Sequence, residues 1–158
     1  MKNAALAAGL LLLVVPQVTL AQNEVFAGTW KADIAKSTYQ SGAVPKRETL
    51  RFEPIGETFK VSLDGMNERG AYHSEATGKF DGVDVAVEAS PPRPARFTYA
   101  FQRIDARTWT IVIKVNGERR ILVHNVVSED GKTMRSISTV TNRDQINQVV
   151  IYEKQQHI

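Results

Sequence analysis

The sequence contains no cysteine among its 158 residues. Disulfide bonds, thiolate metal sites and a cysteine nucleophile are therefore excluded, and so is a lipid-modified cysteine at a processed N-terminus. A chain of this length buries enough apolar surface to fold without cross-links. The absence thus restricts the chemistry of the protein without arguing against a stable domain.

An excess of charge of one sign is also lacking. Lysine and arginine number 20 against 17 aspartate and glutamate residues, and the basic residues are scattered. No basic stripe is interleaved with aromatic residues, so nucleic acid is not a predicted partner. A glycine-rich phosphate loop and a G-x-S-x-G nucleophile elbow are missing as well, which argues against nucleotide binding and serine hydrolysis.

The first 21 residues have the pattern of a secretory signal peptide. Lys2 precedes an apolar run over residues 4–15, and the small residues Thr19 and Ala21 end the segment. The run is shorter than the roughly 20 residues that a membrane-spanning helix needs. We expect cleavage after Ala21, a mature domain formed by residues 22–158, and a periplasmic or secreted location without stable membrane insertion.

The remaining sequence alternates short β-rich runs with turns. Asn116-Gly117 is the strongest hairpin signal, because a type I′ turn needs two positive φ angles. The prolines in residues 90–94 interrupt the pattern, and only residues 31–40 could form a helical turn or two. Strands are predicted from Trp30 onward and over residues 47–54, 58–64, 71–77, 83–87, 96–102, 109–115, 118–127, 133–141 and 146–154.

This spacing predicts an all-β fold, a single antiparallel up-and-down barrel of about eight to ten strands. Closure removes the two exposed edges of such a meander. We expect residues 146–154 to pair with the first strand and Trp30 to be buried at one end. An outer-membrane barrel is the alternative, although several runs are shorter than the roughly nine to eleven residues of a spanning strand.

Several motifs carry a resemblance to known families. Gly28-Thr29-Trp30-Lys31 resembles the G-x-W signature of lipocalins and fatty-acid-binding proteins, together the calycins. With Lys36-Ser37, Tyr39, Pro45-Lys46 and the segments 79–82, 127–134 and 150–154, it is similar to small secreted bacterial lipocalin-like proteins. The resemblance implies a barrel with a hydrophobic cavity and a structural role for Gly28 and Trp30.

Two departures separate the chain from the fatty-acid-binding branch. That branch has an arginine two residues before its last-strand tyrosine, which grips the ligand carboxylate, whereas Val150 precedes Tyr152 here. Residues 31–46 are also too short and too polar for the branch's two-helix lid. The resemblance therefore implies a cavity but not fatty-acid binding.

Aromatic side chains on neighbouring predicted strands mark the candidate ligand site, although ordinary core packing is the alternative. Ser136, Ser138, Thr139 and Thr141 place small polar groups on both faces of a strand, which leaves space inside the barrel whichever face turns inward. We expect the cavity to open near residues 90–94. The candidate ligand-binding residues are Phe97, Tyr99, Phe101, Arg103, Trp109, Ile111, His124 and Tyr152.

The histidines do not predict a metal site. His73, Glu75 and His124 could meet across strands, but no metal-ligand spacing occurs, and no metal or cofactor is predicted. Both faces of residues 119–127 carry apolar side chains, so the pattern leaves open whether His124 is a satisfied buried residue or a ligand contact.

The leading functional hypothesis is binding of a small hydrophobic molecule. The alternative is a cofactor-independent isomerase or cyclase in the same cavity, with His124, Tyr72 or Tyr99 as acid or base. A protein-binding module with a filled barrel is a further possibility. The sequence does not identify the ligand, the oligomeric state or whether the protein is a carrier or an enzyme.

Overall fold

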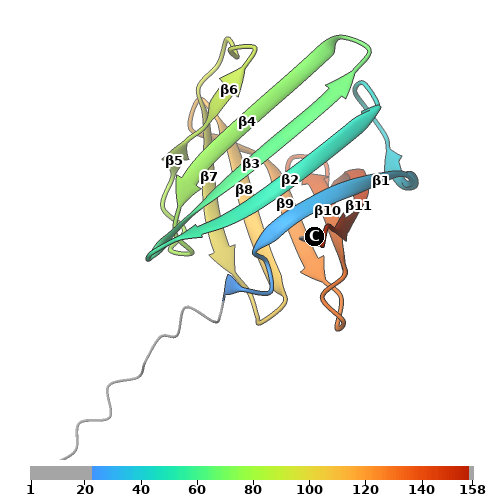
Figure 1. Cartoon of the computed structure of the whole chain (residues 1–158). Helices are drawn as coiled ribbons and strands as arrows, with labels where there is room; N and C mark the ends of the chain where they lie inside the picture. The colour runs from blue at the N-terminus through green and yellow to red at the C-terminus, as the bar shows by residue number, and fades with distance from the viewer. Residues whose placement is uncertain (1–22, 157–158) are drawn as a thin grey trace, which may run out of the picture.

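Eleven strands, each antiparallel to its neighbours, form one sheet that curls into a barrel (Figure 1). The computed structural model describes residues 23–156, so the predicted signal peptide and His157 lie outside the described residues. No helix within residues 23–156 is long and apolar enough to cross a membrane. The strands are β1 (Gly28–Tyr39), β2 (Arg47–Ile55), β3 (Thr58–Asn67), β4 (Gly70–Gly78), β5 (Val85–Ala86), β6 (Glu88–Ser90), β7 (Phe97–Arg103), β8 (Thr108–Val115), β9 (Glu118–Val127), β10 (Thr133–Val140) and β11 (Gln145–Lys154).

Pairing of the first strand with the last closes most of the barrel, as the sequence predicts. Trp30 is opposite Lys154 and Ala32 is opposite Tyr152 in the β1–β11 ladder. The order of strands is β5-β7-β8-β9-β10-β11-β1-β2-β3-β4-β6, which leaves a seam between the β4/β6 and β5/β7 edges. On one side of this seam the Gly82 amide, just before β5, donates to the Phe101 carbonyl of β7 at 2.9 Å and so extends the β5–β7 pairing.

The β8–β9 hairpin confirms the Asn116-Gly117 prediction. β8 ends at Val115 and β9 begins at Glu118, so the two residues form the whole turn. Asn116 has a φ of 52° and Gly117 a φ of 84°. Two consecutive positive φ angles match the twist of the flanking strands, so this dipeptide pairs Val115 with Glu118. The register then shifts between Ile113 and Lys114.

Residues 31–40 do not form a helical turn, because β1 extends through Tyr39. Residues 28–31 pair with β2, and the strand pairs with β11 on its other side. The β1–β11 register shifts between Asp33 and Thr38. A bulge in a long strand therefore replaces the expected turn, since the pairing of residues 32–33 and 38–39 with β11 outweighs a weak local preference.

Large side chains fill one end of the barrel interior. Trp30 is fully buried, and its indole Nε1 donates to the Phe26 carbonyl oxygen at 2.8 Å. The Phe52 and Phe59 rings stack with centroids 4.6 Å apart. The expected burial of Trp30 is thus confirmed. The same core contains an aromatic cluster formed by Phe26, Phe52, Phe59, Phe80, Phe101 and Trp109.

Candidate functional site

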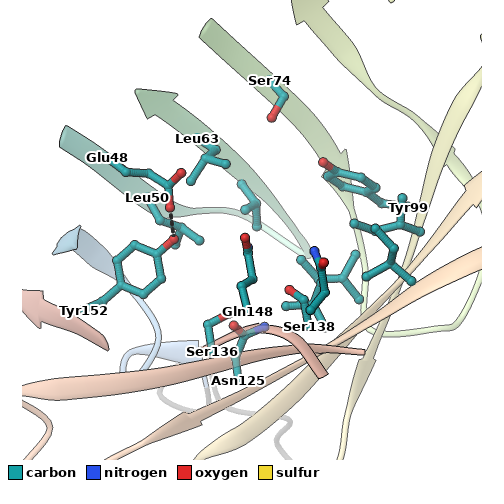
Figure 2. A pocket seen from close by; sticks show the side chains of 16 residues that line it. Glu48, Leu50, Leu63, Ser74, Tyr99, Asn125, Ser136, Ser138, Gln148 and Tyr152 are labelled. Atoms are coloured by element: carbon teal, nitrogen blue, oxygen red, sulfur yellow. Dashed lines mark hydrogen bonds between the residues drawn. The ribbon is translucent and has the colours of Figure 1, made fainter. Parts of the chain in front are cut away.

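A cavity of about 250 Å³ lies in the other half of the barrel interior (Figure 2). On β8, Trp109 belongs to the packed end, whereas Ile111 and Ile113 line the cavity. Met134 on β10 is in the core, and Ser136 and Ser138 of the same strand face the cavity. The remaining lining residues are Glu48, Leu50, Val61, Leu63, Ser74, Tyr99, Ile121, Val123, Asn125, Asn147, Gln148 and Tyr152.

Short side chains create this space. Ser74 on β4 and Ser136 and Ser138 on β10 are buried, yet each occupies an inward position that a larger residue could fill. The walls around them are aliphatic, as at Leu63 and Val123. A mostly apolar lining with a few placed polar groups is the usual composition of a small-molecule site. The small polar residues of β10 thus leave space inside the barrel, as the sequence suggests.

A buried carboxylate lies at the wall of the cavity. Glu48 is 7% exposed, and its two oxygens accept hydrogen bonds from the hydroxyls of Tyr72 and Tyr152, each at 2.6 Å. The Tyr72 ring covers Gly65 on β3, at a point where a Cβ would overlap it. The Glu48 carboxylate of β2 is therefore linked by hydrogen bonds to one tyrosine of β4 and one tyrosine of β11.

The tyrosines of this cluster are held in their neutral form. Burial first, and then the nearby Glu48 charge, raise the pKa of Tyr152 well above its ordinary value. Burial and the hydrogen bond to Glu48 likewise raise the pKa of Tyr72. Burial also raises the pKa of Tyr39, with a further contribution from Glu48. Tyr72 and Tyr152 consequently remain hydrogen-bond donors to the carboxylate.

Asn125 contributes a second polar group to the cavity wall. Its side chain is 1% exposed, and neither the amide nitrogen nor the amide oxygen has a hydrogen-bond partner within the described part of the chain. Figure 2 places it close to Ser136 on the cavity wall. A buried amide without partners is costly. This residue therefore leaves two donor hydrogens and an acceptor oxygen unused at the cavity wall.

Three of the eight candidate ligand residues line the cavity, namely Tyr99, Ile111 and Tyr152. Phe101 and Trp109 are fully buried in the aromatic cluster beside it. That any of these five residues contacts a ligand stays a prediction. The structure therefore divides the predicted aromatic set between the cavity wall and the core.

The other three candidates lie away from the cavity. Arg93 covers the ring of Phe97 at 4.3 Å, and both line a shallow groove at the rim. The Arg103 guanidinium lies over Phe26 at the packed end, 5.1 Å from the ring centroid. On β9 the cavity-lining residues are Ile121, Val123 and Asn125, so His124 has the opposite orientation and is half-buried.

The loop of residues 90–94 does not line the cavity. It borders a separate groove together with residues 67–73 around the β3–β4 turn. His73 on β4 bonds Asp64 and Glu75 through its two ring nitrogens. Within residues 23–156, no group of three or more potential metal ligands has a suitable arrangement.

Glu48 and Asn125 are two of the cavity-lining residues that the sequence interpretation did not include in the site. Glu48 shares the parity of Leu50 and Phe52, so a carboxylate on the apolar face of a strand was the available signal. Asn125 likewise shares the parity of Ile121, Val123 and Val127, so it lies on the same face of its strand as these apolar residues. Each is a single polar residue in an inward-facing series.

Comparisons with solved structures give similar barrels. A Schistosoma mansoni fatty-acid-binding protein in complex with arachidonic acid matches with a TM-score of 0.65 and 17% identity, over 85% of this chain and 99% of that one. A mutant of the fluorescent protein UnaG matches with a TM-score of 0.63 and 17% identity, over the same shares. The scan against protein-family models and the search of curated proteins found no match.

The fold is therefore a nearly closed antiparallel barrel of the calycin type, in the form seen in fatty-acid-binding proteins. Its strand count of eleven slightly exceeds the predicted eight to ten, because the short β5 and β6 occupy the two edges of the sheet. The structure has no helix between β1 and β2, where residues 40–46 form a loop. Residues 31–46, which are too short for a two-helix lid, therefore consist of the rest of β1 and this loop.

Proposed function

We propose that the protein binds a small hydrophobic molecule in the cavity. The observation that carries the proposal is the combination of an aliphatic wall with the buried, unpartnered amide of Asn125. A filled barrel, as in a protein-binding module, would leave no interior space beside this amide. The similar barrel that holds arachidonic acid supports the same conclusion at the level of fold.

The size of the cavity limits the ligand. Its volume of about 250 Å³ is just below the range of about 300–1,000 Å³ that is typical of ligand pockets. A compact molecule with up to about three rings suits this space better than a long acyl chain does. The ligand is therefore expected to be smaller than a drug-sized compound or to project from the cavity.

Binding is tested with N-phenyl-naphthylamine, an uncharged apolar dye whose fluorescence rises when it leaves water. We expect saturable binding to the wild-type protein. Ser138→Leu should abolish the signal or weaken binding at least about tenfold, because the added methyl groups occupy the cavity. Its free energy of unfolding should change by less than about 1.5 kcal/mol, since filling an existing space does not strain the core.

Thr139→Leu is the matched control, since Thr139 is the next residue of β10 and lines a groove outside the barrel instead of the cavity. It should leave dye binding unchanged. Equal dye binding by wild type and Ser138→Leu would show that the dye does not use this cavity. A complete lack of binding by the wild-type protein would count against the proposed function.

The isomerase or cyclase hypothesis concerns the same cavity. Of its three candidate acid–base residues, Tyr99 lines the cavity, His124 lies on the opposite face of its strand, and the Tyr72 hydroxyl is bonded to Glu48. The geometry thus favours binding over acid–base chemistry by these residues. Native mass spectrometry of the protein from its source would show whether a bound molecule is retained.

We also propose that the protein acts outside the cytoplasm, in the periplasm or as a secreted protein. The basis is the sequence pattern of residues 1–21, which lie outside the described residues. The intact mass of the exported protein tests this directly. A mature N-terminus at Gln22 supports the proposal, and retention of the whole chain in the cytoplasm would contradict it.

A further inference from the structure

The cavity has an uneven distribution of charge. Glu48 is its single acidic lining residue, and no lysine, arginine or histidine lines it within residues 23–156. The carboxylate forms no ion pair in the described part of the chain. The groups that contact it are neutral phenols from β4 and β11. A ligand therefore meets negative charge without compensation from a protein cation.

Glu48 also has unused capacity to accept hydrogen bonds. An ionised carboxylate has about four acceptor positions, and the two tyrosine hydroxyls occupy one position on each oxygen. Figure 2 shows Glu48 and Tyr152 together at the cavity wall, away from Asn125. A donor on the ligand can bond Glu48 while the Asn125 amide bonds a second polar group or remains beside the apolar body.

We propose that the cavity selects apolar molecules that carry an amine, with the Glu48 carboxylate as the group that binds the ammonium. This inference rests on the proposed binding function and specifies its ligand class. A charged donor paired with a buried carboxylate forms a stronger hydrogen bond than two neutral groups form. A ligand carboxylate in the same place would instead face a like charge in a poorly hydrated site. The cavity thus has the opposite charge preference to a fatty-acid site.

Three compounds of one shape test the proposal: naphthylethylamine, naphthylethanol and naphthaleneacetic acid. Their affinities for the wild-type protein are measured by isothermal titration calorimetry at neutral pH. We expect the amine to bind about ten- to a hundredfold more tightly than the alcohol, the range set by one charge-assisted hydrogen bond. The acid should bind more weakly than the alcohol.

Glu48→Gln removes the charge and keeps an acceptor oxygen. It should bring the amine to within about threefold of the alcohol and leave the affinity for the alcohol nearly unchanged. Glu53→Gln is the matched control, because it removes the same charge from an exposed position on the same strand. The control should retain the preference for the amine. Circular dichroism establishes that both variants are folded.

The possible outcomes separate the two proposals. Dye binding by the wild-type protein with equal affinities for all three compounds, or with the acid bound best, would overturn the amine preference and leave the binding function intact. A lack of binding by the dye and by all three compounds would overturn both. The wild-type comparison tests the amine preference even if Glu48→Gln does not fold. Retention of the preference by a folded Glu48→Gln would overturn the role of Glu48.

Discussion

Trp30 links the earliest sequence motif to the packed end of the barrel. Its side chain is fully buried, and its indole nitrogen is bonded to the Phe26 carbonyl. The Lys154 ammonium lies over the ring, 5.1 Å from its centroid. One residue near the start of β1 is therefore held by the segment before it and by the last strand.

Replacing Trp30 should destabilise the whole domain. Trp30→Ala should lower the free energy of unfolding by about 3–5 kcal/mol, the range for loss of a large aromatic side chain from a core. Trp30→Phe should cost less, because it keeps most of the packing and loses the hydrogen bond to Phe26. Urea unfolding measures both effects. A cost below about 1 kcal/mol for the alanine variant would contradict the structural role of this residue.

The residue scale also shows where sequence interpretation stops. Alternation identifies which positions of a strand share a face, and it placed Tyr99 and Ile111 together correctly. It does not reveal that the Glu48 carboxylate has partners, because Tyr72 and Tyr152 are distant in sequence. A buried carboxylate is costly without such donors, so alternation alone does not identify Glu48 as a site residue.

At the scale of elements, the strands that could be predicted are those whose pairing depends on residues close in the sequence. The β8–β9 turn is determined by two adjacent residues and was predicted from them, whereas the register shift between Ile113 and Lys114 was not. The course of β1 depends on β2 and on β11, which lies more than a hundred residues away. Local patterns carry no information about such partners, so the bulge after Asp33 was missed.

The β3–β4 pair carries a pH-sensitive cross-strand contact. His73 is opposite Asp64 in the ladder, and its Nδ1 lies 2.7 Å from the carboxylate. Its Nε2 lies 3.3 Å from Glu75. The hydrogen bond to Asp64 is the largest cause that raises the pKa of His73 above its ordinary value of 6.5, and the same bond lowers the pKa of Asp64.

These shifts set the sign of the pH dependence. The contribution of His73 to stability is complete below its ordinary pKa of 6.5 and is lost as pH rises through the higher folded-state pKa. Asp64 adds stability above its ordinary pKa of 3.8 and loses it as pH falls through the lower folded-state pKa. The effect is small, because solvent screens these partly exposed side chains.

Histidine titration by NMR provides the measurement. The pKa of His73 should exceed 6.5 in the wild type and fall toward that value in Asp64→Asn, where the charged partner is removed. The stability difference between the two proteins should shrink as pH rises above the folded-state pKa of His73. A wild-type pKa below 6.5 would be evidence that the contact does not form in solution.

At the scale of the whole molecule, the cavity connects nearly all of the long strands. Its walls include residues of β2, β3 and β4 on one side and of β7 to β11 on the other. The two groups of strands are continuous through β1 and separated at the seam. A bound molecule would touch both sides, so it should stabilise the barrel as one unit.

Ligand binding should therefore raise the stability of the entire domain. With N-phenyl-naphthylamine at about one hundred times its Kd, the free energy of unfolding should rise by about 2.7 kcal/mol. Hydrogen exchange should slow in strands on both sides of the seam. Protection confined to one side would indicate that the dye binds at the surface. Ser138→Leu should gain at most about 1.4 kcal/mol at the same dye concentration, the value for binding that is tenfold weaker.

The seam has a consequence for how copies of this protein behave in concentrated solution. The two edge strands are only two and three residues long, and Pro91 and Pro92 directly follow β6. A free edge promotes aggregation when it offers another chain a long row of unpaired amides and carbonyls. Here the template is short, and the prolines have no amide hydrogen to donate. The barrel can leave its ring of strands incomplete without exposing a surface on which fibrils could start.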